Sequence, residues 1–365
     1  MKRMLCLLLL IPLLRNGILS ADAGEETAEL TGIEQVEDGL DERERAVGGE
    51  LKLDGSYDAA GALGRLAESF RVAFTERLLD ELGFGLKLVL LALSCGLCSV
   101  FGTDRRFDSF LEIAACCGAS LLLAGGVGGV FGQAEEALYR LSDYAGAAFP
   151  AFFTTVAACG TAGSAAVKYA AVSFVMDLFL SLSQKLILPL IHAHLAVSVC
   201  CSLFENALLK AAARFTKWCA VTILTLLTMG FCTYISLSGL VSASADAAAV
   251  KTAKSVISTT LPVVGGILSD SAAAILSAAA VIRNSAGVFC LIAVCAICCG
   301  PFALLSVKML VLKGASALSE LCCGGRLSRL LGDFGSAFGL LLAMVGCGGF
   351  MLFYSFLSGI RMTGA

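Results

Sequence analysis

Two aspartates lie inside long apolar stretches of the sequence, Asp177 in SFVMDLFL and Asp270 in TTLPVVGGILSDS. A carboxylate at bilayer depth is costly and suggests a functional site, such as a proton relay or an intramembrane protease dyad. The Gly-x-Gly-Asp arrangement of such a protease is missing, because Gly265-Gly266-Ile-Leu-Ser precedes Asp270. We therefore favour a structural role, in which Asp270 caps the N-terminus of a half-helix after the Pro262 break.

The other candidates for chemistry are histidine and cysteine. His192 and His194 would point about 200° apart on a helix, so we expect no metal ion between them. None of the 17 cysteines lies between residues 24 and 82, and most lie in apolar stretches, where Cys behaves as a small apolar side chain. The C-x-x-C pairs at 95–98 and 295–298 fall inside predicted spans, so we expect no metal or redox role for them.

The composition decides the class of protein that must position these residues. Of 365 residues, 58% are apolar and 15% are charged, and the mean hydropathy is +0.87. A soluble domain carries about 25% charged residues. The values predict an all-α, polytopic transmembrane protein. The charges are uneven, with 16 acidic and 6 basic residues from 24 to 82, against 12 and 17 from 83 onward.

The N-terminal residues predict export of the acidic segment. Lys2 and Arg3 precede the apolar run Met4–Leu14, and Ala21-Asp22-Ala23 fits a cleavage site, so we interpret 1–23 as a cleaved signal peptide. Residues 24–82 are then an acidic extracytoplasmic segment. Its end repeats apolar residues every three or four positions from Leu63 to Leu78, which predicts an amphipathic helix. Residues 83–365 form the predicted multi-span membrane domain.

Positive charge orients the predicted spans, because short loops rich in Lys and Arg face the cytoplasm. Three such regions carry Arg105 and Arg106, then Lys210 to Lys217, then Lys313 to Arg329. The charged residues 132–146 are expected to form an outer loop. We also expect a break near Gln184, Lys185 and Pro189. The predicted spans are Phe84–Phe101, Phe110–Phe131, Ala147–Val167, two short helices within Tyr169–Phe204, Trp218–Val241 and Phe334–Ile360.

The last two positive regions are both expected on the cytoplasmic side, so the chain between them must cross the membrane an even number of times. Three apolar segments lie there, however: 218–241, 255–281 and 286–312. Residues 255–281 contain Pro262 and Gly265-Gly266, so we expect this segment to enter from the outer side and leave again. Such a loop is tolerated only where freed backbone groups face protein or a wet cavity. The result is a prediction of seven or eight membrane segments.

The sequence KTAKSVISTTLPVVGGILSDSAAAILSAAAVIRNSAGVFCL resembles the signature region of the stage III sporulation protein AE family of endospore-forming bacteria. FPAFFTTVAACGTAGSA and LILPLI resemble two further segments of that family, and the resemblance covers about residues 84–360. The matching positions that we take as a structural signature are Pro150, Gly160, Pro189, Lys251, Lys254, Pro262, Gly265, Gly266, Asp270, Asn284, Gly287 and Pro301.

The resemblance implies a multi-pass protein of the mother-cell membrane that faces the forespore. There it would act with other membrane proteins of the same sporulation operon, in a transenvelope channel or secretion-like complex needed for forespore development. The resemblance implies no catalytic activity, cofactor or metal. The expected partners are those proteins and the lipid bilayer, without nucleic acid, and homo-oligomerisation stays open. The alternative is a secondary transporter or permease, which would use broken helices near the midplane, and a third hypothesis is an intramembrane hydrolase.

Overall fold

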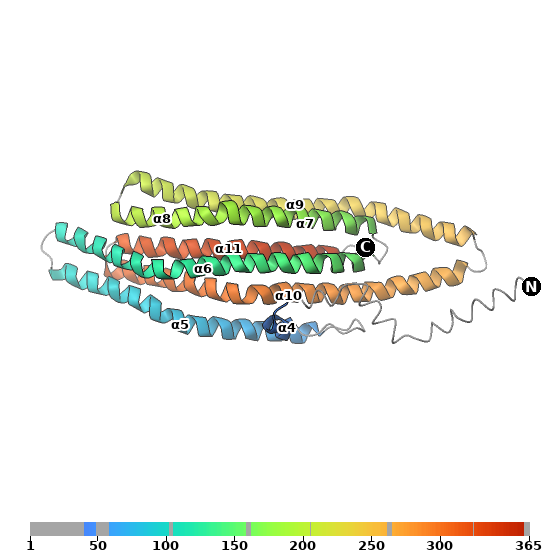
Figure 1. Ribbon diagram of the computed structural model, residues 1–365, viewed down its shortest axis with the longest axis horizontal. Helices are drawn as coiled ribbons and strands as arrows, with labels where there is room; N and C mark the ends of the chain where they lie inside the picture. The colour runs from blue at the N-terminus through green and yellow to red at the C-terminus, as the bar shows by residue number, and fades with distance from the viewer. Residues whose placement is uncertain are drawn as a thin grey trace, which may run out of the picture.

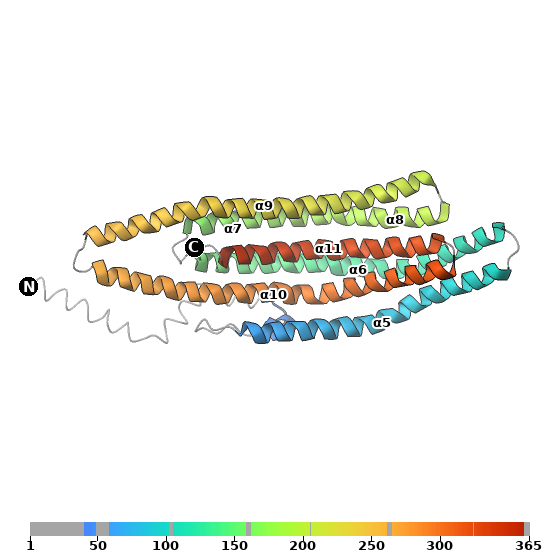
Figure 2. The same ribbon diagram turned by 180° about the vertical axis from the view of Figure 1, so that it is seen from behind.

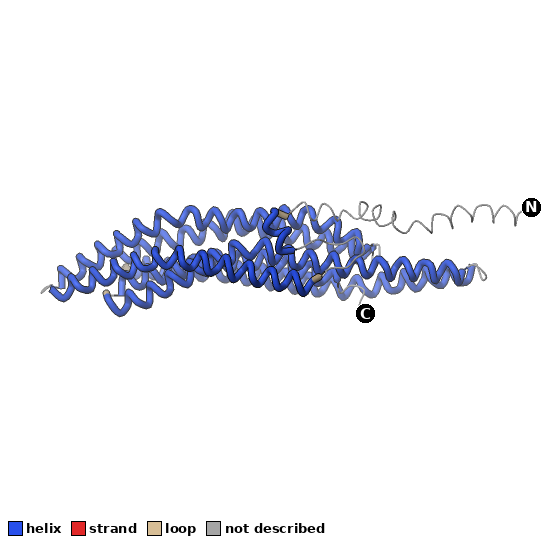
Figure 3. The backbone as a smooth tube through the Cα atoms, turned by 90° about the horizontal axis from the view of Figure 1, so that it is seen from below, coloured by secondary structure: helices blue, strands red, loops and turns tan. Residues whose placement is uncertain are grey.

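A computed structural model describes residues 40–48, 58–101, 105–157, 162–204, 206–260, 265–323 and 325–360. Within these it leaves the side chains of 43, 48, 105, 162–164, 235–260 and 265–283 undescribed. Nearly all the described residues are helical, and none is in a strand (Figure 3). The predicted signal peptide and most of the acidic segment before residue 58 lie outside the described residues.

The helices form one elongated bundle in which consecutive long helices run in opposite directions (Figure 1). Among the described residues, six helical runs are long and apolar enough to cross a membrane by length and composition. The elements are α4 (Glu42–Gly48), α5 (Ala59–Phe101), α6 (Arg105–Val156), α7 (Ala162–Leu182), the π-helix η2 (Ser183–Ile187), α8 (Leu188–Phe204), α9 (Ala207–Thr260), α10 (Gly265–Cys322) and α11 (Gly325–Ile360).

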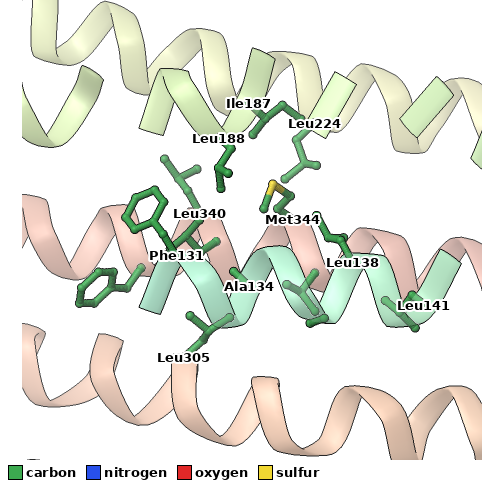
Figure 4. Packing of buried hydrophobic residues seen from close by; sticks show 14 of the residues in the cluster. Phe131, Ala134, Leu138, Leu141, Ile187, Leu188, Leu224, Leu305, Leu340 and Met344 are labelled. Carbon is green, nitrogen blue, oxygen red and sulfur yellow. The ribbon is translucent and has the colours of Figure 1, made fainter. Parts of the chain in front are cut away.

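The centre of the bundle is the antiparallel pair α10 and α11. In the most apolar part of each, 56% of the residues are buried, against 17% in α9. A helix that is apolar on every face is stable only when other helices surround it. Around α11, Leu188 and Leu224 point toward Leu340 and Met344, and side chains of α6 complete the packing (Figure 4).

The bundle is much longer than a bilayer is thick. The 58 residues of α10 extend about 87 Å at about 1.5 Å per residue, whereas the hydrocarbon core of a bilayer is about 30 Å. The ends of α9 and α10 that face each other across residues 261–264 extend beyond the other helices (Figures 1 and 2). We call residues 235–260 and 265–283, which include the projecting ends, the α9–α10 hairpin.

The three positively charged regions lie at one end of the bundle, where α5 meets α6, α8 meets α9 and α10 meets α11 (Figure 1). We call this the basic end. Between the second and third regions the chain runs along the bundle and back as two helices, α9 and α10. Residues 255–281, which were expected to form one segment that enters and leaves the outer side, are divided between the end of α9 and the start of α10.

Several sequence predictions are corrected by the continuity of the helices. The expected outer loop at 132–146 is wrong, since α6 runs through it without interruption and includes Pro150. Likewise α5 joins the amphipathic stretch to the first apolar span in one helix. The described residues therefore contain six candidate spans in place of seven or eight. Asp270 is not an N-cap, because α10 begins at Gly265 and Asp270 lies inside it.

The break expected near Pro189 is a π turn within a continuous helical run. Pro189 has no N–H to donate, and its ring crowds the carbonyl of the preceding turn, so regular α-helical bonding fails before it. The chain compensates by widening, and the Leu188 N–H donates to the Ser183 carbonyl oxygen, five residues back. The two short helices that the sequence suggested are thus joined, and residues 165–204 form one candidate span.

Candidate functional site

Two signature segments that are far apart in the sequence meet in the half of the bundle away from the basic end. Gly287 of α10 is buried where α10 crosses α6 and the end of α11. A Cβ at Gly287 would lie 2.5 Å from Ile360 Cγ1 and 3.1 Å from Phe152 Cε2. A Cβ at Gly359 of α11 would also collide with Phe152. Both glycines therefore permit a close helix approach that a larger residue would prevent.

Aromatic rings fill the space around these glycines. The Phe152 ring lies 5.2 Å from that of Phe356 at an interplanar angle of 77°, and Phe149 lies 5.2 Å from Phe356. Edge-to-face pairs of this kind add to the stabilisation from burial. We call Phe149, Phe152, Gly287, Phe356 and Gly359 the aromatic node. It links α6, α10 and α11, and its role is packing, since it holds no ionisable group.

The remaining signature positions lie elsewhere on the chain. Lys251 and Lys254 are near the end of α9, and Gly265 and Gly266 begin α10, all in the α9–α10 hairpin (Figure 2). Asn284 is exposed on α10 at the base of this hairpin. Gly160 and Pro262 lie outside the described residues, while Pro150, Pro189 and Pro301 lie within α6, α8 and α10.

A polar cavity of about 1110 Å³ lies between α4, α5, α6 and α10. Arg140 of α6 lines it and binds two carboxylates of the α4 region, with Nη1 2.6 Å from Asp41 and Nη2 2.7 Å from Glu44. The Asp41 N–H donates to Glu44 Oε2 at 2.9 Å, an N-terminal capping bond. Pro301 and Gly300 of α10 line the same cavity.

Burial raises the pKa of the Glu44 carboxyl above its ordinary value, although the Asp41 N–H and the Arg140 guanidinium oppose this. The effect of burial is the larger one, because Glu44 is only 7% exposed. Sequence reasoning missed this contact, since nothing local joins residues 41–44 to residue 140. The spacing of Asp41 and Glu44 was an available signal for a short helix.

A further polar contact ties the end of α11 to α7. Lys168 is buried, and its Nζ donates to Ser358 Oγ at 2.8 Å and to the Ser358 carbonyl oxygen at 3.2 Å. A lysine at this position satisfies a carbonyl that the end of a helix leaves without a partner, and its charge favours the helix C-terminus. Lys168, which falls between the predicted spans Ala147–Val167 and Tyr169–Phe204, lies inside α7.

The model of the family described as stage III sporulation protein AE matches residues 61–360, from the first turn of α5 to the end of α11. The chain belongs to the stage III sporulation protein AE family. The Bacillus subtilis (strain 168) stage III sporulation protein AE is 26% identical over 194 residues, 53% of this chain and 48% of that relative. The matched part thus spans about half the length of the curated relative. No solved structure matches the chain.

In this member of the sporulation AE family, the candidate acid and histidines do not come together. Asp177 is exposed on α7, and the side chain of Asp270 is outside the described residues, so the structure does not test a dyad of the two. His192 stacks on Phe131 of α6 with ring centroids 3.7 Å apart. His194 faces α9, where its Nδ1 lies 3.1 Å from the Ala213 carbonyl oxygen. The two histidines thus face different helices, as their spacing predicted.

The C-x-x-C pair at 95–98 does not act as a unit. Cys98 is exposed, whereas Cys95 is buried with its Sγ 2.9 Å from that of Cys323, beyond the end of α10. The sequence spacing does not predict the contact between Cys95 and Cys323, because that contact depends on the packing of α5 against α10. Among the described residues of this sporulation AE chain, no group of three or more His, Cys, Asp or Glu is placed to hold a metal ion.

Proposed function

We propose that this protein is a membrane component of a transenvelope channel or secretion-like complex between mother cell and forespore. It would reside in the mother-cell membrane, with the basic end in the cytoplasm and the opposite end toward the forespore. Its contribution would be assembly, without catalysis of its own. The family membership supports a role in sporulation.

The observation that carries the proposal is the length of α9 and α10. With 54 and 58 residues, each extends well beyond the hydrocarbon core of about 30 Å. Part of the bundle must therefore stand in an aqueous space. The part that projects farthest is the α9–α10 hairpin, which holds the largest share of the signature residues. A rigid projection from a membrane suits contact with proteins in the space between two membranes.

Site-specific photo-crosslinking in sporulating cells tests this proposal. A photoreactive residue at Lys254 should form adducts with other membrane proteins of the same sporulation operon, identified by mass spectrometry. The matched control is Leu226, which is also on α9 but is an exposed apolar residue closer to the basic end. We expect position 226 to give lipid adducts, because its surroundings would be acyl chains.

Two results would count against the proposal. Adducts at 254 with proteins unrelated to sporulation would remove the assembly role. Equal labelling of the same partners from 226 and 254 would remove the specific role of the hairpin, since a partner would then contact α9 along its whole length.

The transporter alternative receives less support. A transporter site of this type uses matched broken helices near the midplane. Pro150 and Pro301 instead lie in continuous α-helices. In the described part of the chain, the π turn η2 interrupts the run of α7 and α8 without a matching interruption in α6 or α10.

A further inference from the structure

A second cavity, of about 440 Å³, lies at the basic end between α8, α9 and the start of α11. Five cationic side chains and one carboxylate line it: Lys210, Arg214, Lys217, Arg326, Arg329 and Asp333. The cations come from two of the three positively charged regions of the sequence, which the fold brings together around one space. We call this cavity the basic pocket.

The positive charge of the basic pocket is only partly balanced within the protein. Arg326 Nε lies 3.1 Å from Glu112 of α6, so this cation is paired. Lys210, Arg214 and Lys217 follow the i, i+4, i+7 spacing of one helix face. Among the described residues, none of these three forms an ion pair with a carboxylate. Like charges on one helix face repel, so this face would be stabilised by an anion.

A second observation also indicates a ligand in the basic pocket. His194 and Ser198 of α8 line it and are 2% and 1% exposed. His194 Nε2 and Ser198 Oγ are both buried without a hydrogen-bond partner in the described part of the protein. Since the Ala213 carbonyl can only accept, His194 Nδ1 carries the proton and Nε2 is an acceptor. A buried polar atom without a partner is costly, so a ligand that supplies partners would relieve that cost.

The surroundings of the pocket are those of a membrane interface. Phe215 and Trp218 alternate with Arg214 and Lys217 along α9, and both aromatic side chains are mostly exposed. Aromatic residues of this kind concentrate where acyl chains meet headgroups. Basic pockets between membrane helices on the positively charged side accommodate the headgroups of anionic lipids.

We infer that the basic pocket binds a phosphate group. Its oxygens accept hydrogen bonds from Lys210, Arg214 and Lys217, and Ser198 Oγ donates to the same group. His194 Nε2 accepts a hydrogen bond from a protonated phosphate oxygen or from a water molecule bound to the phosphate. The phosphate comes from the headgroup of an anionic phospholipid or from a free phosphate compound. The inference is independent of the channel assignment, because it rests on different residues.

Binding to the purified full-length protein in detergent tests this inference. The probes are short-chain phosphatidylglycerol, short-chain phosphatidylcholine and inorganic pyrophosphate, and the readout is the ligand concentration that raises the thermal unfolding midpoint halfway. The test variant is Lys210→Gln with Lys217→Gln. The matched control is Lys87→Gln with Lys185→Gln, which removes two exposed lysines outside the pocket.

For an anionic probe we expect about 30-fold weaker binding in the test variant, because each cation contributes about 1 kcal/mol to binding a lipid phosphate. The control should bind like the parent protein. Stabilisation by phosphatidylglycerol alone identifies a lipid headgroup, and stabilisation by pyrophosphate as well identifies a site for phosphate from either source. Equal effects of phosphatidylglycerol and phosphatidylcholine, or equal binding by test variant and control, would overturn the inference.

A single substitution guards against a folding artefact. Ser198→Ala removes a hydroxyl that has no partner in the described protein. We expect the unfolding midpoint without ligand to stay the same or rise, because a buried unsatisfied group disappears. Binding of the anionic probe should weaken by a few fold. A lower midpoint without ligand together with unchanged binding would contradict a ligand-binding role for Ser198.

Discussion

α5 and α11 are almost equally apolar but differ in what surrounds them. The mean hydropathy of their most apolar stretches is 2.1 and 2.0, yet 22% of that stretch is buried in α5 and 56% in α11. Hydropathy therefore does not decide which helix occupies the centre of this bundle. In a membrane, lipid is as apolar as a protein interior, so the hydrophobic effect does not sort the helices.

Close packing involves more sides of α11 than of α5, although Gly85 and Gly96 of α5 also approach α10 closely. On α11, Gly339, Gly346 and Gly349 face α10, and a Cβ at these positions would lie 3.0 Å from Met309 Sδ, 3.1 Å from Phe302 and 2.7 Å from Cys298 Sγ. Small residues let two helices approach closely and gain dispersion contacts. On α5, Leu86, Leu90, Leu93 and Leu97 are exposed at intervals of one turn. That row of large side chains suits contact with acyl chains.

The two regions also differ in the forces that attach them. Apolar packing dominates along α11, where an ion pair joins Arg326 at its first turn to Glu112, whereas α4 and α5 depend more on ion pairs. Glu81 of α5 pairs with Lys308 of α10, and the α4 region is held by Arg140. Changes in packing should therefore affect α11 most, and changes in charge should affect α4 and α5.

The largest effect is expected from removing a central ring. Phe356→Ala deletes a fully buried side chain of the aromatic node and should cost about 3–5 kcal/mol of unfolding free energy. Leu97→Ala removes a side chain that is 63% exposed on α5 and should cost little. Thermal unfolding in detergent measures both changes. Equal losses would show that α5 is as tightly enclosed as α11, which would break the comparison.

A smaller effect is expected from filling the α10–α11 contact. Gly349→Leu places a side chain against Cys298 and should cost about 1–3 kcal/mol, because a packed interior has no room for added methylenes. Gly349→Ala should be milder, since the Cys298 thiol can rotate. Gly64→Leu on α5 is the control, because nothing lies within 4 Å of its Cβ position. A benign Gly349→Leu variant would refute close packing as the cause.

Next in size is the loss of the α4 attachment. Arg140→Ala leaves the Glu44 carboxyl without its cation and should weaken the docking of α4 by about 1–2 kcal/mol, a value discounted because Arg140 is one-third exposed. Hydrogen exchange of the α4 amides should accelerate, while exchange in α11 stays unchanged. Arg71→Ala, which removes an exposed pair with Glu68, is the control. Faster exchange in α11 would mean that α4 supports the centre.

The smallest effect concerns pH. The pKa of Glu44 is raised in the folded protein, so the docked α4 holds the proton more tightly than the released segment does. The contribution of this group is fully present below its ordinary pKa of 4.5 and is lost as pH rises through the raised value. Protection of the α4 amides, corrected for intrinsic exchange, should therefore increase from pH 7 toward 4.5. Glu44→Gln should remove this dependence.

The all-α class could be predicted from the sequence, and so could the position of the three positively charged regions at one end of the bundle, because hydropathy and charge can be read from local sequence. The continuity of α6 was harder to predict. Arg140 and its neighbours suggested an outer loop, but Arg140 is neutralised by Asp41 and Glu44, which are about a hundred positions away. One signal was present and overlooked. Ala134, Ala137, Leu138, Leu141 and Tyr144 are all buried and follow a helical period.

The basic pocket and the aromatic node could not be predicted from spacing. His194 was considered only with His192, although its neighbours come from α9 and α11. Gly287 was identified through the family resemblance, and the reason for a glycine there lies in Phe152 and Ile360 on two other helices. Contacts between distant segments depend on which helices pack together, and periodicity within one helix does not contain that information.

The α9–α10 hairpin also has a mechanical consequence. Its α10 arm runs from Gly265 to Asn284 at the base of the hairpin. This arm is about 30 Å long at about 1.5 Å per residue. An arm of this length would act as a lever if it pivoted at Gly287 in the aromatic node. A tilt of about 10° at this pivot would displace the tip by about 5 Å, so repacking of a single ring would be amplified into a motion large enough to engage or release a neighbouring protein.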